Sequence, residues 1–154
     1  MWKCRRKLIN PYEYPLTPRM LVLSSAAFLL PALAAARRGW LAVSAAHIVS
    51  AGASIVYHRG SEHTCRTAHV ADIGFAVMCV CIDAFILLFY GTPLLGCAAI
   101  GLLLLALAFF TNTDASLPLT QQYTPAYVLD HSLWHCTAAL AAFCCIVSAR
   151  DGVV

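Results

Sequence analysis

The chain has 154 residues, of which 61% are hydrophobic and 11% are charged, and its formal net charge is +3. Because an ordinary soluble domain is about one quarter charged, this composition excludes a typical soluble protein and predicts an integral membrane protein. The positive charge is concentrated near the N-terminus, where anionic lipid explains it better than nucleic acid does.

Residues 1–19, MWKCRRKLINPYEYPLTPR, form a basic, proline-broken segment before the first long apolar run. The segment lacks the pattern of a secretory signal, and its Trp, Tyr, Lys and Arg side chains favour the headgroup zone of a membrane. We expect an interfacial or disordered segment at 1–19, one transmembrane helical domain at 20–148 and a short tail at 149–154.

Five apolar stretches approach the roughly 20 residues that an α-helix needs to cross a bilayer. They lie near residues 20–36, 40–58, 68–90, 92–111 and 126–148. Pro31 interrupts the first stretch, where neighbouring helices can accommodate it, and the sequence ARRG then predicts a tight turn. The predicted fold is therefore all-α, a multi-pass transmembrane bundle of about five spanning helices.

Ionisable side chains inside these stretches are the best functional candidates, because a charged group costs at least about 2.5 kcal/mol at mid-bilayer. Ser54 and His58 stand near the end of the second stretch, and Asp72 stands near the start of the third. His131 and His135 lie near the start of the fifth, in DHSLWHCTAALAAF. Counting the membrane crossings brings all five residues to the same side of the bilayer.

These residues fit a catalytic zinc site. His131 and His135 share one helix face, and with His58 they would leave a fourth tetrahedral position for water, whose pKa zinc can lower to about 7. We expect Asp72 to accept a proton from that water or to orient a ligand histidine. We expect Ser54 to donate a hydrogen bond to the water or to an oxyanion. A lipid is the expected substrate, because it can reach this level laterally.

Each residue also has a structural alternative. The two histidines of the fifth stretch could bond backbone carbonyls, and Asp72 could be a helix-start residue that the helix dipole favours. Ser54 could bond back to its own helix, as serine commonly does.

The spaced set SxxxH, Asp72 and HxxxH resembles that of the CREST superfamily of membrane hydrolases, which includes alkaline ceramidases and the progestin and adiponectin receptors. Three sequence segments are most similar to the myomaker and transmembrane protein 8 family. They are LSSAAFLLPALAAARRGW, the YH that closes the second stretch, and HSLWHCTAAL. The resemblance covers roughly residues 20–90 and 126–148. It implies zinc on His58, His131 and His135, with Asp72 and Ser54 completing the site, and cleavage of a lipid amide or ester.

The chain departs from that family in length. The family has seven helices, whereas here one long apolar stretch separates the Asp72 helix from the HxxxH helix, where three are usual. Removing two helices keeps the crossing parity, so the ligands still meet, but it removes part of the wall of the pocket.

His47 and Asp83 form a second polar set. Each lies 11 residues from a candidate site residue, His47 before His58 and Asp83 after Asp72. Eleven residues are close to three helical turns, so both extend the same faces about 16 Å deeper. We expect a structural pair, with a proton relay as the alternative.

Cysteines and arginines give weaker indications. At least five of the eight cysteines fall inside the apolar stretches, where free cysteine packs as a small hydrophobe. Positive-inside counting places the N-terminus in the cytoplasm, whereas the family resemblance implies the reverse orientation, with Arg37 and Arg38 inside.

Two classes of function follow. The first is a multi-pass, zinc-dependent hydrolase of a lipid amide or ester. The second is a non-enzymatic membrane protein, either a receptor or fusion factor with a structural metal site, or a small ion or proton pathway.

Overall fold

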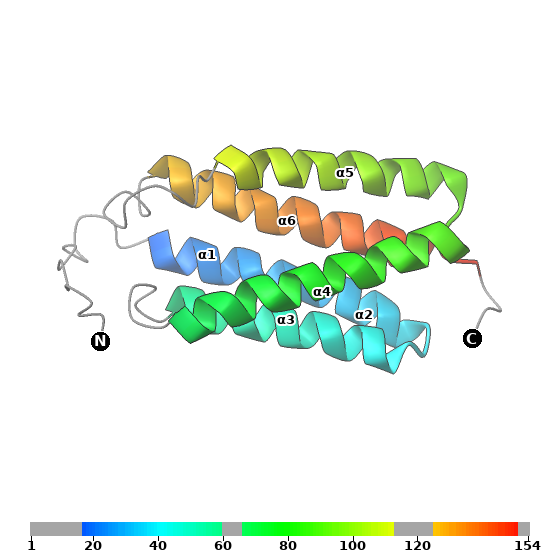
Figure 1. The fold of residues 1–154 in the computed structure, drawn as a ribbon, viewed down its shortest axis with the longest axis horizontal. Helices are drawn as coiled ribbons and strands as arrows, with labels where there is room; N and C mark the ends of the chain where they lie inside the picture. Colours follow the sequence, from blue (N-terminus) through cyan, green and yellow to red (C-terminus); the bar gives the residue numbers. More distant parts are fainter. Residues whose placement is uncertain (1–16, 60–65, 113–124, 151–154) are drawn as a thin grey trace.

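The computed structural model describes residues 17–59, 66–112 and 125–150. These residues form an all-α bundle without a β-strand, apart from one isolated bridge between Gly91 and Ala149. Five helices are long and apolar enough to cross a membrane, which confirms the predicted number of spans. Their arrangement is that of a multi-pass membrane protein (Figure 1).

The first span, expected near 20–36, is a broken helix. It consists of α1 (Thr17–Ser25), a 3₁₀ turn (Ala26–Phe28) and α2 (Leu29–Arg37). Pro31 explains the break, because it has no N–H to donate to the carbonyl four residues earlier and is tolerated only in the first turn of a helix.

The turn after α2 follows the ARRG prediction. Gly39 has φ 77°, and the amides of Gly39 and Trp40 bond the carbonyls of Ala36 and Ala35 at 3.0 and 2.9 Å. This is the Schellman pattern, in which a glycine in the left-handed region ends a helix. It reverses the chain into the second span.

The remaining spans match the expected boundaries to within two residues. They are α3 (Leu41–Arg59), α4 (Arg66–Tyr90), α5 (Pro93–Asn112) and α6 (Pro125–Ser148). Proline is the first residue of both α5 and α6, a position where its fixed φ suits a helix and its missing N–H leaves no bond unmade.

Helix α6 lies at the centre of the bundle, packed against α5, α1, α2 and α4, while α3 packs against α4, α2 and α1 (Figure 1). The core follows α6 in three small clusters, many of whose members are alanines that let helices approach closely. Large apolar side chains point outward instead, as Leu88 and Leu94 do with 80% and 83% exposure. Buried polar groups and exposed apolar groups are the distribution that suits a lipid environment.

The six cysteines in the described residues are all free. Cys79 and Cys145 are buried, as the packing interpretation requires. Cys81, Cys97 and Cys136 are exposed, so they do not contribute to the core. Cys4 and Cys65, and most of the basic segment 1–19, lie outside the described residues.

Candidate metal centre

The three predicted metal ligands meet at one end of the bundle. His58 is in the last turn of α3, and His131 and His135 are in the N-terminal part of α6. Figure 1 shows that α3 ends where α6 begins, because the chain crosses the membrane twice between them. The three side chains expose only 1%, 8% and 0% of their surface, respectively.

The imidazoles form a compact triangle. The ring centroid of His58 lies 4.9 Å from that of His131 and 5.2 Å from that of His135, and the two α6 rings are 4.6 Å apart. One nitrogen from each ring lies within 4.8 Å of the others. A tetrahedral ion with bonds of about 2.0–2.1 Å holds its ligand nitrogens roughly 3.3 Å apart, so binding would draw these nitrogens closer together. The convergence predicted from the crossing count is therefore present.

The donor atoms fit a metal ion. Both ring nitrogens of His131, and Nε2 of His135, are buried without a hydrogen-bond partner among the described residues. A buried polar atom without a partner is costly, and neutral imidazole is the commonest metal ligand in proteins. A bound cation would satisfy these nitrogens, so the group is able to hold one metal ion.

Two serines of the first span belong to the site although the sequence analysis gave them no role. Ser24 Oγ lies 2.9 Å from His135 Nδ1, and Ser25 Oγ lies 3.5 Å from the same nitrogen. Both hydroxyls also donate to the carbonyl of Leu21, at 3.0 and 2.8 Å. Their only signal in the sequence is a pair of adjacent polar residues in an otherwise apolar stretch.

Ser54 and Asp72 lie at the same end of the bundle. Ser54 is buried one turn before His58, and its hydroxyl is 3.0 Å from Ser25 Oγ. Asp72 is buried in α4 at 6% exposure. Among the described residues, the group of possible metal ligands consists of the three histidines and does not include Asp72. It is six residues from the start of α4 (66 to 72), as His131 is from the start of α6 (125 to 131), so the two lie at a similar depth. Their catalytic roles remain predictions.

The second polar set forms the expected pair. His47 Nε2 lies 3.2 Å from Asp83 Oδ1, and both side chains are buried. This contact joins α3 to α4 deeper in the bundle than the histidine triangle.

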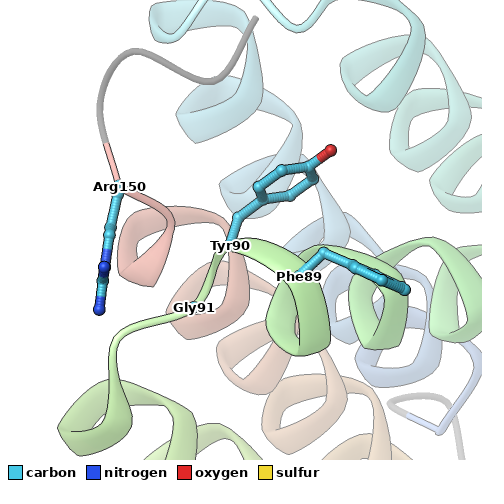
Figure 2. A pocket seen from close by; sticks show the side chains of 4 residues that line it. All are labelled: Phe89, Tyr90, Gly91 and Arg150. Carbon is cyan, nitrogen blue, oxygen red and sulfur yellow. The ribbon is translucent and has the colours of Figure 1, made fainter.

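A pocket of about 360 Å³ occurs at the opposite end of the bundle, where α4 and α6 end. It is lined by Phe89, Tyr90, Gly91 and Arg150, whose labelled side chains point in different directions (Figure 2). It is therefore separate from the histidine triangle.

No family model, curated protein or solved structure matches this chain. The fold and the site define a class, which is a membrane-type helical bundle with a buried three-histidine group that could bind a metal ion.

Proposed function

We propose that this protein is an integral-membrane, zinc-dependent hydrolase that cleaves an amide or ester bond of a lipid. The observation that supports the proposal most strongly is the buried triangle of His58, His131 and His135. Three histidines are a typical ligand set of catalytic zinc, which keeps a further coordination position open. The resemblance of the spaced residue set to the CREST superfamily points to the same metal and reaction.

Zinc in this position would supply an activated water at neutral pH and would polarise a substrate carbonyl. Asp72 is the proposed general base, because it is a buried carboxylate at the depth of His131. Ser54 is proposed to help orient the site through its hydroxyl, which Ser25 contacts.

The depth of the triangle supports a lipid substrate. His131 is six residues into α6, or about 9 Å along the helix axis at 1.5 Å per residue. A helix of 24 residues is about 36 Å long and slightly exceeds the hydrocarbon core of about 30 Å. If α6 is centred in the bilayer, the triangle would lie close to the membrane interface, where the ester and amide linkages of lipids are found.

The test is to reconstitute the purified protein in bilayers containing ceramides and phospholipids, then measure zinc content and fatty acid release. We expect stoichiometric zinc and release of fatty acid from at least one lipid class, and the loss of both in His135→Ala. His69→Ala is the matched control, because His69 is an exposed histidine at the same end of the bundle and lies outside the triangle.

A structural metal clamp in a non-enzymatic protein is the second candidate. The near-complete burial of His58 and His135 favours it, since a structural zinc site is closed to exchange. A protein that holds stoichiometric zinc and loses stability without it, yet releases no fatty acid from any lipid tested, would be a clamp.

A further inference from the structure

Two polar residues at the end of α1, directly before the break in the first span, contact the candidate metal centre. The 3₁₀ turn at Ala26–Phe28 starts directly after Ser24 and Ser25, and both serines are buried, at 8% and 0% exposure. Phe28, within the turn, packs edge-on against His135 with ring centroids 5.8 Å apart. This segment therefore contacts His135 with both a hydroxyl and an aromatic edge.

The choice of acceptor for the Ser24 hydroxyl proton is linked to where His135 carries its proton. Ser24 has one hydroxyl proton, which it donates to the carbonyl of Leu21 at 3.0 Å. With the proton donated to that carbonyl, Ser24 accepts at its 2.9 Å contact with His135 Nδ1, and neutral His135 would carry its own proton on Nδ1. The other nitrogen, Nε2, is left with its lone pair.

We propose that Ser24 is a positioning residue that holds His135 in the Nδ1–H tautomer, so that His135 binds the metal ion through Nε2. This inference rests on the proposed metal centre but not on lipid hydrolysis. Nε2 is the buried nitrogen of His135 that has no hydrogen-bond partner among the described residues. Metal-binding histidines generally donate their other ring N–H to an acceptor, which fixes the tautomer and the ring orientation.

Ser25 extends the same network to the third helix. Its hydroxyl bonds the carbonyl of Leu21 at 2.8 Å and also lies 3.0 Å from Ser54 Oγ, a contact in which either hydroxyl can be the donor. One backbone carbonyl in α1 therefore orients hydroxyls that lead to α6 and to α3. Because its distance to Nδ1 is 3.5 Å, Ser25 has a smaller part than Ser24 in holding His135.

A different chemistry would use the same 2.9 Å contact, with Ser24 as a nucleophile and His135 as its base. In that case the serine proton would point to the histidine and not to Leu21. The buried Nε2 of His135, which has no hydrogen-bond partner among the described residues and which a metal ion would satisfy, favours the positioning role. A serine-reactive fluorophosphonate distinguishes the two, because only an activated serine nucleophile reacts with it.

The experiment compares the full-length protein with Ser24→Ala, Ser24→Thr and Ser148→Ala. Ser148 is the matched control, because it is a buried serine that donates to a carbonyl three residues earlier in its own helix, at 2.7 Å, as Ser24 does. Zinc and cobalt(II) affinities are measured by competition with a chelator, and histidine tautomers are measured by ¹⁵N NMR of the metal-free protein.

We expect Ser24→Ala to lower the affinity for both metals by about 10- to 100-fold, the usual effect of removing such a partner. We expect Ser148→Ala to bind like the unmodified protein and Ser24→Thr, which keeps the hydroxyl, to recover most of the affinity. In the metal-free unmodified protein, His135 should be the Nδ1–H tautomer, and Ser24→Ala should show a mixture.

Equal metal affinity in Ser24→Ala and the unmodified protein, an Nε2–H tautomer in the unmodified protein, or fluorophosphonate labelling of Ser24 would each overturn the proposal. Because none of these three readouts requires turnover, the outcome is independent of the proposed hydrolase activity. If no lipid is cleaved but the tautomer and affinity results hold, the proposed function fails and the role of Ser24 stands.

Discussion

His47 Nε2 on α3 lies 3.2 Å from Asp83 Oδ1 on α4, and the two side chains expose only 1% and 11% of their surface. His47 precedes His58 by 11 residues (58 minus 47) in the same helix, so the pair is about 16 Å deeper along α3 than the metal centre. An ionisable side chain at such a depth needs a partner, and each residue provides one for the other.

The pair should therefore contribute to stability mainly as a unit. Replacing Asp83 alone by leucine leaves His47 without its acceptor, which typically costs about 3–5 kcal/mol for a buried ion pair, whereas replacing both partners by apolar residues is much less costly. We expect Asp83→Leu to lower the free energy of unfolding in detergent more than the double variant His47→Leu/Asp83→Leu does. Strictly additive effects of the two single substitutions in this cycle would show that the residues are not coupled.

The positions of these ionisable residues could be predicted because they depend on simple geometry. The pairing of His47 with Asp83 follows from equal offsets of 11 residues along two neighbouring helices. The meeting of His58 with His131 and His135 follows from the parity of membrane crossings. Both arguments need only helix rise, helix period and the number of spans.

The roles of Ser24 and Ser25 could not be predicted in this way. In a regular helix, adjacent residues point about 100° apart, since there are 3.6 residues per turn, so no pattern indicates that both serines face the interior. Their placement depends on how α1 packs against α3 and α6, which the sequence alone does not indicate.

The three ligand histidines should be equally necessary for metal binding. We expect His58→Ala, His131→Ala and His135→Ala each to reduce zinc in the purified protein from about one equivalent to well below it, because two imidazoles bind zinc much more weakly than three. Metal analysis by mass spectrometry provides the measurement, with His69→Ala as the control that retains zinc. Full zinc occupancy in any of the three ligand variants would remove that residue from the site.

Zinc should also stabilise the fold, because a ligand that binds only the folded state raises its stability. Free zinc at 1,000 times its dissociation constant contributes about 4 kcal/mol, which corresponds to a rise of about 8–16 °C in Tm for a chain of this size. Thermal unfolding with zinc, with a chelator and with magnesium as the control measures the effect. An unchanged Tm on zinc removal from a protein shown to contain it would argue against a site in the folded bundle.

The stabilisation by zinc should decrease as the pH falls. Zinc binds imidazole only in its neutral form, so protons compete with the metal and binding releases protons. The difference in Tm between the zinc-loaded and chelator-treated protein should therefore shrink with acidification and be smallest at the lowest pH at which the protein stays folded. A difference that grows on acidification would mean that groups other than the histidines hold the metal.

A substitution of Asp72 distinguishes the proposed hydrolase from a protein with a purely structural metal site. A general base typically contributes 10²- to 10⁴-fold to a rate. Among the described residues, Asp72 is not one of the three whose possible metal-ligand atoms lie within 4.8 Å of one another, so its loss should leave the metal ligands in place. We therefore expect Asp72→Asn, which keeps the size of the side chain, to retain most of the zinc and to lose at least 100-fold in the rate of fatty acid release.

Asp83→Asn is the matched control, because Asp83 is an equally buried acid in the same helix but belongs to the deeper pair. Unchanged turnover in Asp72→Asn would exclude the carboxylate from the reaction, and equal losses in both variants would point to a general effect of removing a buried charge from α4.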